Sequence, residues 1–407
     1  MKIGIITIGS ELLNGTRLDT NSKWIAESVA PFDCEIVSKI SLHDNEQDIV
    51  DALDYYFSLS LDMILCTGGL GPTHDDITAT TIYNYFDDTP VFDDKYWKIL
   101  KNEFKKRGFN ISELNKSQAL KPTIGEIIPN KIGTARGLNY KKNNTRIVVM
   151  PGVPREMKSM MNDSIIPIIK SSSTNSTLNK IYRTTGIPES HLYESLLPLI
   201  NNYNQVKVAF LPSFMGVDIR ISSKEKSNFD NFNHELLPII EEYYYGENNI
   251  ELEDVVVKLL HKHNLSIATA ESCTGGLLGD RLTNVSGVSN NYKGGAITYS
   301  NQMKIDMLGV NESTIQKFGA VSEQTAEEMA IGAQKTFLSD IGISTTGIAG
   351  PTGGSKEKPV GLVYIGLHSA KLTKVYKFNF KLDRKSNKMI TSQAVLNIIR
   401  KYLLNLY

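Results

Sequence analysis

The sequence predicts an α/β protein in which two three-layer α/β domains with mainly parallel sheets are joined by a small α+β module. Short apolar runs alternate with segments of helical periodicity over the first 170 residues, and this alternation returns after residue 251. Several of the apolar runs end in glycine-rich segments, which are typical of loops that follow parallel strands. The segment between follows a different order, helix, two strands and helix, so we expect three domains, 1–170, 171–250 and 251–407.

Length and charge limit the possible classes of protein. At about 150 residues a domain, 407 residues correspond to two or three domains. The 44 Lys and Arg residues equal the 44 Asp and Glu residues, which argues against a dedicated binder of nucleic acids or anionic membranes. Three cysteines without a C-x-x-C pattern predict neither a disulfide framework nor a zinc site. No apolar run approaches the roughly 18 residues of a membrane helix, and we expect a cytoplasmic protein.

Each element of the first domain follows from a local pattern. Lys2–Ile8 is an apolar run of strand length, too short for a signal peptide, and Asn45–Ser58 has apolar residues at helical spacing. Asn21 or Ser22 is expected to cap the first long helix, and the small polar residues Lys170–Thr177 predict a linker or an exposed turn. The predicted strands are Lys2–Ile8, Glu35–Ile40, Asp62–Thr67 and Arg146–Met150, and the predicted helices are Asn21–Ala30, Asn45–Ser58, Asp76–Phe86 and Arg155–Met161.

The same reasoning gives the elements of the other two domains. The middle module is predicted to contain helices at His191–Ile200 and near Phe229–Tyr243, and strands at Val206–Leu211 and Val217–Ser222. The last domain is predicted to contain helices at Leu252–His263 and Leu277–Leu282, and strands at Ser266–Ala270, Gly295–Thr298, Ile341–Thr345 and Gly361–Ala370. The middle module has no motif that indicates chemistry, so we expect it to serve packing or oligomerisation.

Two loops of the first domain are candidate anion sites. Ser10 and Glu11 follow the first strand, and the segment Thr67–Asp76 contains three glycines before Asp75 and Asp76. Glycines allow a backbone to approach a phosphate, and adjacent carboxylates suit a hard divalent cation. The alternative is structural, because Asp75 is also a good helix cap and Asp76 complements a helix dipole. The turns Gly133–Gly137 and Met150–Met157 fall at successive strand ends of the same sheet.

The segment Glu271–Gly276 (Glu-Ser-Cys-Thr-Gly-Gly) is the strongest motif of the last domain. It links a strand to a helix, so helix N-terminal amides beside Ser272 can hold an oxyanion or a phosphate. Ser272 is a possible nucleophile with Lys304, one helix and one strand later, as its base, provided that burial lowers the pKa of the lysine. Cys273 is the rival nucleophile, because a helix N-terminus favours a thiolate, and spacing alone does not choose between the two.

A dense glycine loop follows the strand at Ile341–Thr345. It runs from Thr346 to Gly354, and Lys358 comes shortly afterwards. Such a loop indicates either a close backbone approach to a ligand, with Lys358 adding charge for a phosphate, or a flexible surface loop.

These motifs together resemble the CinA (competence/damage-inducible) family. The resemblance rests on Thr67–Asp76, Met150–Met157, Glu271–Gly276, Tyr299–Lys304 and Thr346–Gly361, and it covers nearly the whole chain. The first part is similar to the molybdopterin-binding domain shared by MoaB and MogA. The last part is similar to the stand-alone nicotinamide-mononucleotide amidase PncC.

The resemblance implies that the last domain hydrolyses nicotinamide mononucleotide to nicotinic acid mononucleotide and ammonia, without a cofactor. Ser272 would be the nucleophile, Lys304 its base, and Tyr299 would orient or relay the proton. Amides near Ser272 or in the Thr346–Gly350 loop would hold the oxyanion. The implied substrate-binding residues are Thr274, Gly275, Gly276, Thr346, Gly347, Gly350, Gly353 and Lys358.

The resemblance also implies that the first domain cleaves ADP-ribose to AMP and ribose 5-phosphate with Mg²⁺, Mn²⁺ or Co²⁺ held by Asp75 and Asp76. The residues expected around that substrate are Ser10, Glu11, Gly68, Gly69, Gly71, Thr73, Thr134, Gly152 and Glu156. Arg136 stands where the family usually has proline, which places a cation where an anionic substrate is expected.

Two other functions remain as alternatives. The first domain would be a pterin- or nucleotide-binding module without hydrolytic activity, or the protein would act as an interaction factor in competence. We expect small nucleotides as ligands, a homodimer by resemblance, and no membrane or direct nucleic-acid partner.

Overall fold

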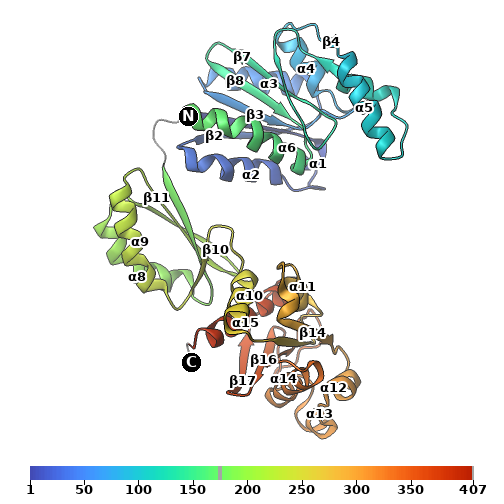
Figure 1. The fold of residues 1–407 in the computed structure, drawn as a ribbon. Helices are drawn as coiled ribbons and strands as arrows, with labels where there is room; N and C mark the ends of the chain where they lie inside the picture. Colours follow the sequence, from blue (N-terminus) through green and yellow to red (C-terminus); the bar gives the residue numbers. More distant parts are fainter. Residues whose placement is uncertain (173–176, 406–407) are drawn as a thin grey trace. The chain divides into compact units, whose positions relative to one another are not determined.

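The computed structural model describes residues 1–172 and 177–405, which form two compact units, Met1–Asn179 and Lys180–Tyr407 (Figure 1). The predicted α/β fold class is confirmed. The second unit contains both the middle module and the last α/β domain. Within the described residues, no helix combines the length and the apolar character needed to cross a membrane.

The first unit is built on a six-stranded sheet with the strand order β2-β1-β3-β8-β7-β6. The first four strands in that order are parallel, and β7 and β6 join antiparallel at one side. The strands are β1 (Lys2–Ile8), β2 (Glu35–Leu42), β3 (Met63–Thr67), β6 (Glu126–Ile128), β7 (Gly137–Lys142) and β8 (Thr145–Met150), and a separate pair is formed by β4 (Val91–Phe92) and β5 (Leu120–Lys121).

Helices cover both faces of this sheet. They are α1 (Ser10–Leu13), α2 (Thr20–Val29), α3 (Glu46–Ser58), α4 (Thr78–Tyr85), α5 (Asp94–Lys106), α6 (Pro154–Met160) and α7 (Ile166–Ser172), with a π-helical stretch between the last two. Ile5 of β1 packs with residues of α2 and α6, whereas the next residue, Ile6, packs with α3 and α4. The alternation of strand side chains between two buried faces explains why the strands are apolar throughout.

Three local predictions for this unit need correction. The cap of α2 is Asp19 rather than Asn21 or Ser22, because the Asp19 carboxylate accepts a hydrogen bond from the Ser22 amide. Helix α4 begins at Thr78, so Asp75 does not cap it. The predicted linker is helical in α7 up to Ser172, residues 173–176 lie outside the described residues, and the Thr177 hydroxyl donates to Asp33.

The second unit opens with a four-stranded sheet of order β10-β11-β9-β12, in which β10–β11 and β9–β12 are antiparallel pairs. Its elements are β9 (Leu178–Thr184), α8 (Glu189–Asn202), β10 (Lys207–Ser213), β11 (Gly216–Ser223), α9 (Lys226–Ile240) and β12 (Tyr244–Glu247). Helices α8 and α9 lie side by side against the sheet (Figure 1). The strands β9 and β12 were not predicted from the sequence.

The last domain is a five-stranded sheet of order β14-β13-β15-β16-β17. Strands β14, β13 and β15 are parallel, and β16 and β17 continue the sheet antiparallel. The strands are β13 (Ile267–Glu271), β14 (Tyr292–Ile297), β15 (Ile341–Gly347), β16 (Leu362–Ser369) and β17 (Thr373–Asn379), and the helices are α10 (Leu252–His263), α11 (Leu277–Thr283), α12 (Asn301–Leu308), α13 (Glu312–Phe318), α14 (Glu323–Phe337) and α15 (Arg384–Leu403).

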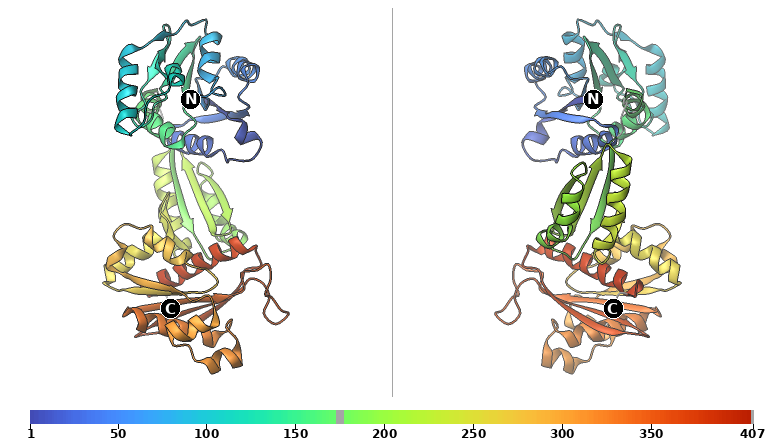
Figure 2. Two further views of the ribbon diagram at one scale, coloured as in Figure 1. Left: turned by 90° about the vertical axis from the view of Figure 1, so that its right-hand side faces the viewer. Right: turned by 90° about the vertical axis from the view of Figure 1, so that its left-hand side faces the viewer.

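Helices also cover both faces of this second sheet. Residues of α10, α11 and α15 form one apolar core with Ile267 and Ile343, and residues of α12 and α14 form another with Ala268 and Ala270. Figure 2 shows α15, in red, across one face of the sheet, with the orange helices on the other side. The three parallel strands end at one edge, where the loops after β13, β14 and β15 meet.

Candidate functional site

The loop after β13 and the start of α12 bring Ser272 and Lys304 into contact. Ser272 follows the last residue of β13, and Lys304 lies in the first turns of α12, which follows β14. Lys304 Nζ lies 3.1 Å from Ser272 Oγ and donates to the Thr298 carbonyl at 2.8 Å. The adjacent parallel strands therefore unite two residues that are 32 positions apart in the sequence.

The environment of Lys304 suits a neutral amine. Its side chain is 1% exposed, and burial lowers the pKa of its ammonium group, while no carboxylate contributes to that pKa. Desolvation disfavours the charged form of a lysine unless an acid compensates. A neutral Lys304 can accept the hydroxyl proton of Ser272, so the pair has the composition of a nucleophile and its base.

Cys273 differs from Ser272 in both burial and ionisation. Its thiol points into the core that contains α10 and α11, and burial raises its pKa to about 12. The thiol therefore stays protonated near neutral pH, where it is a poor nucleophile. Of the two candidates that the spacing left open, the geometry favours Ser272.

The amides at the start of α11 are already occupied, which corrects the expectation that they hold an anion. The buried Glu271 carboxylate accepts hydrogen bonds from the amides of Gly276, Leu278 and Gly279, at 2.9, 3.1 and 2.8 Å. Among the described hydrogen bonds, none uses the amides of Thr274 and Gly275, so these remain as donors for an oxyanion.

Gly276 shows why this loop needs glycine. Its φ is +92°, and a Cβ atom there would lie 2.9 Å from Ile297 Cδ1. A side chain at this position would be both strained and crowded.

Tyr299 contacts an arginine that sequence reasoning missed. Its side chain is 62% exposed, and its hydroxyl accepts a hydrogen bond from Arg384 Nη2 at 2.7 Å. Arg384 Nη1 donates at the same distance to the Gly350 carbonyl. The first residue of α15 thus joins the loop after β14 to the glycine loop after β15. No local pattern around residue 384 indicates this role.

Basic residues of α15 border an open cavity beside the Ser272 loop. The cavity measures about 740 Å³, and Arg384, Lys385 and Lys388 line it together with Pro351. A Cβ atom on Gly275 would lie 3.3 Å from Lys388 Nζ, so this amine lies over the loop that carries Ser272. The cavity offers positive charge to an anionic ligand.

Several residues expected to bind substrate in this domain are engaged elsewhere. Lys358 Nζ donates to the Phe318 carbonyl at 2.7 Å, and the Thr346 hydroxyl donates to the Ala320 carbonyl at 2.6 Å. The buried Thr274 hydroxyl pairs with Thr345. Gly347 lies in the ladder between β15 and β16, and Gly353 in the loop that follows. The structure shows no contact between these side chains and Ser272.

In the first unit, three of the predicted loops meet at the carboxyl edge of the sheet. A Cβ atom on Gly68, whose φ is +120°, would lie 2.0 Å from the Ile8 carbonyl oxygen, and Gly152 packs against Gly68. The Asn21 amide donates to Thr67 Oγ1 and to the Gly152 carbonyl. The glycine loops therefore form one continuous backbone surface, as expected for successive parallel strands.

The polar residues of this edge contact one another rather than converge on one point. Ser10 Oγ donates to Asp44, the Glu11 carboxylate lies against Gly9, and Glu156 accepts from Asn130 and packs on Gly133. Gly69 packs on Thr78 and Gly71 on Asp76.

Asp75 and Asp76, the predicted metal ligands, each contact a neighbouring residue. Asp76 accepts hydrogen bonds from the Thr73 amide and hydroxyl, and exposed Asp75 pairs with His74 at 2.9 Å. In the part of the chain that the structure describes, no group of three or more His, Cys, Asp or Glu residues could hold a metal ion. The metal role of Asp75 and Asp76 therefore stays a prediction.

Arg136, the departure from the family pattern, is held by contacts within the first unit and also lines a small cavity with Gly71 and Asp76. It pairs with Asp93 at 2.8 Å, donates to the Leu120 carbonyl, and lies 3.8 Å from the centroid of the Tyr96 ring. The Tyr96 hydroxyl donates to the Thr134 carbonyl at 2.9 Å. Arg136 thus anchors its loop on α5 and places a cation in the cavity that Gly71 and Asp76 also line.

Comparison with known families divides the chain into three consecutive matches. Residues 4–171 match the family described as "Probable molybdopterin binding domain". Residues 179–246 match the "Damage-inducible protein CinA KH domain", and residues 249–403 match the "CinA C-terminal domain". The middle match adds a domain type that sequence reasoning did not recognise.

Individual relatives match over their full length. A competence-damage inducible protein of Caldicellulosiruptor saccharolyticus is 38% identical over 411 residues, covering 100% of both chains. One from Clostridioides difficile is 39% identical over 415 residues, covering 98% of this chain and 99% of the relative. The crystal structure of competence/damage inducible protein CihA from Agrobacterium tumefaciens matches 36% of this chain and 90% of its own, with 38% identity and a TM-score of 0.36.

Proposed function

Because this chain belongs to the CinA family of competence-damage inducible proteins, we propose that its C-terminal domain is a serine amidohydrolase of nucleotide carboxamides. The proposed reaction converts nicotinamide mononucleotide and water to nicotinic acid mononucleotide and ammonia. The observation that supports it is the contact of Lys304 Nζ with Ser272 Oγ at 3.1 Å, where burial lowers the pKa of the amine.

The proposed chemistry proceeds in two halves. Ser272 Oγ attacks the carboxamide carbon while Lys304 takes the hydroxyl proton, and the amides of Thr274 and Gly275 stabilise the negative oxygen. Lys304 then gives its proton to the leaving nitrogen, so ammonia departs and an ester to Ser272 remains. Water, deprotonated by Lys304, cleaves that ester and restores the hydroxyl.

The basic cavity of α15 supports an anionic substrate for this site. Lys388 lies over Gly275, and Arg384 reaches both flanking loops. We assign the phosphate of the mononucleotide to these side chains, in place of Lys358, which is held by a backbone carbonyl.

The test is ammonia release from nicotinamide mononucleotide by the full-length protein and two adjacent variants. Ser272→Ala is expected to lose activity by a factor of at least about 10³, since Ser272 carries the hydroxyl that contacts Lys304 among the described hydrogen bonds. Cys273→Ala is the matched control, because its thiol stays protonated, and it should turn over within severalfold of the wild type. Loss in Cys273→Ala alone would contradict the assignment of Ser272, and no ammonia from the wild type would contradict the substrate.

For the N-terminal domain we propose cleavage of ADP-ribose to AMP and ribose 5-phosphate. The continuous glycine edge around Gly68 and Gly152 supports binding of a diphosphate. The alternative is a domain that binds a pterin or a nucleotide without hydrolysing it.

Metal dependence separates these two functions. The described residues form no resident metal site, so AMP release should require millimolar Mg²⁺, Mn²⁺ or Co²⁺ and should stop completely with EDTA. Gly68→Ala would place a Cβ atom against Ile8 and should abolish AMP release while leaving ammonia release intact. Binding of ADP-ribose without AMP under any of these metals would favour the non-hydrolytic alternative.

A further inference from the structure

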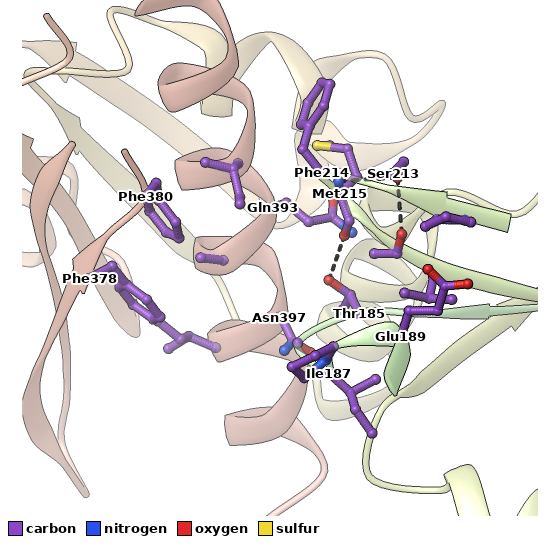
Figure 3. A pocket seen from close by; sticks show the side chains of 18 residues that line it. Thr185, Ile187, Glu189, Ser213, Phe214, Met215, Phe378, Phe380, Gln393 and Asn397 are labelled. Atoms are coloured by element: carbon purple, nitrogen blue, oxygen red, sulfur yellow. Dashed lines mark hydrogen bonds between the residues drawn. The ribbon is translucent and has the colours of Figure 1, made fainter. Parts of the chain in front are cut away.

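The Lys180–Tyr407 unit contains a second cavity that does not include Ser272 or Lys304. It measures about 370 Å³, within the range of about 300–1,000 Å³ that is typical of small-molecule sites. Its walls come from the turn that follows β9, the β10–β11 turn, and the side chains of β17 and α15 (Figure 3).

The walls are mostly apolar and include three aromatic rings. Phe214 and Met215 lie on one side, and Phe378 lies on the other with Phe380, their rings stacked at a centroid distance of 5.2 Å (Figure 3). Glu189, exposed at the rim, is the one charged residue that lines the cavity. An apolar space with a single carboxylate disfavours phosphates and other anions.

Two amide side chains of α15 give this cavity its polarity. Arg281 Nη2 donates to Gln393 Oε1 at 2.9 Å, and Arg400 Nε donates to Asn397 Oδ1 at 3.0 Å. An arginine is only a donor, so both amide oxygens must face their arginines. The NH₂ groups of Gln393 and Asn397 consequently point the other way.

These NH₂ groups have no partner among the described residues. Gln393 is 3% exposed and lines the cavity, as does Asn397 one helical turn later on the same face of α15 (Figure 3). A ligand that supplies acceptors in this cavity would therefore give both NH₂ groups the hydrogen bonds that the protein does not provide. The cavity therefore has two aligned donors in an otherwise apolar space.

We propose that this cavity binds an uncharged, flat ring compound that carries two hydrogen-bond acceptors on one edge. The acceptors, carbonyl oxygens or ring nitrogens, take the NH₂ groups of Gln393 and Asn397. The ring packs between the Phe214–Met215 turn and Phe378. This site lies outside the proposed amidase chemistry, and it excludes the anionic substrate proposed there.

The test uses caffeine and 1,3-dimethyluracil, two neutral rings with two carbonyl acceptors, as probes for the full-length protein. Ligand-observed NMR and calorimetry are expected to show saturable binding of at least one of them. p-Xylene, which lacks acceptors, should bind at least about tenfold more weakly, and benzoate, an anion, should not bind.

A double variant isolates the two donors. Gln393→Glu with Asn397→Asp keeps the oxygens that face Arg281 and Arg400 but replaces both NH₂ groups by acceptors, so the fold is retained and probe affinity should fall at least tenfold. Gln324→Glu, on the exposed face of α14, is the matched control and should leave the affinity unchanged. Ala394→Phe, which fills the cavity, should abolish binding.

Three results would overturn the proposal. These are no saturable binding of either probe, equal affinity in the double variant and the wild type, or retained binding after Ala394→Phe. Ammonia release is measured on the same preparations, so the amidase proposal can fail or stand independently of this site.

Discussion

The protonation of Lys304 depends on its burial. In the folded chain burial holds its pKa below the ordinary value of about 10.4, whereas the unfolded chain restores that value. At pH values between the folded and the unfolded pKa of Lys304, the unfolded state binds more protons, so the free energy of unfolding rises with pH over this range. At pH values below the folded pKa, the folded protein carries a buried positive charge that no carboxylate compensates.

Replacing Lys304 by methionine should remove that cost. We expect Lys304→Met to unfold at a higher temperature than the wild type at pH 6, with the difference shrinking toward pH 10. Calorimetry across this pH range measures it. A difference that does not change with pH would contradict a charged Lys304 at low pH.

The same residue sets the pH dependence of the proposed amidase. Only the neutral amine can act as a base, so kcat/KM for ammonia release should rise about tenfold per pH unit and level off below pH 10.4. The pH–rate profile of the wild type is the measurement. A plateau that begins only above pH 10.4 would mean that burial does not lower the pKa of Lys304.

Arg136 is expected to contribute to the stability of the first unit. Its side chain and that of Asp93 are 9% and 18% exposed, and removing one partner of a buried pair costs about 3–5 kcal/mol. Arg136→Met should therefore destabilise the first unit by roughly 3 kcal/mol in denaturant unfolding. Adding Asp93→Asn, which keeps an acceptor for the Tyr96 amide, should recover part of the loss. Additive effects of the two changes would show that the pair is not coupled.

Among the elements, α11 depends on a residue that precedes it. The Glu271 carboxylate satisfies three amides at the start of this helix, which a helix must pair with some acceptor. A glutamine has a single carbonyl oxygen, so at least one of these buried amides would lose its partner.

Glu271→Gln is therefore expected to lower the free energy of unfolding by about 1–3 kcal/mol. It should also slow ammonia release, because the loop that carries Ser272 is held by the same bonds. Glu323→Gln, an exposed change in the first turn of α14, is the control. Equal stability of the two variants would contradict the capping role of Glu271.

At the scale of the whole molecule, each unit encloses its own apolar core. The cores around β1 draw on residues of Met1–Asn179, and those around β13 on residues of Lys180–Tyr407. Calorimetry should therefore resolve two transitions. Arg136→Met should lower one of them, Glu271→Gln should lower the other, and ammonia release should be unaffected by Arg136→Met. A common shift of both transitions would show that the units unfold as one.

The local patterns of this chain were sufficient for its architecture. Lys2–Ile8 and Leu252–His263 have the bounds that periodicity predicts, because a continuous apolar run or a helical stripe depends only on neighbouring residues. The meeting of Ser272 and Lys304 was also within reach, since adjacent parallel strands end at one edge. The edge strands β12 and β17 were missed, and so was the interior strand β9, most of whose residues are only partly buried and which mixes polar with apolar side chains.

The sequence by itself thus determined the fold class, the loops that hold the candidate sites and the residues that compete within them. Only the tertiary structure decided how those residues are used. In the folded protein Lys304 is buried with no carboxylate that acts on its pKa, and the Cys273 thiol is buried as well. The Glu271 carboxylate accepts hydrogen bonds from amides at the start of α11, and Arg136 pairs with Asp93. Burial and hydrogen-bond partners come from segments far apart in the chain, and Arg384 reaches Tyr299 across 85 positions, so no local pattern contains them.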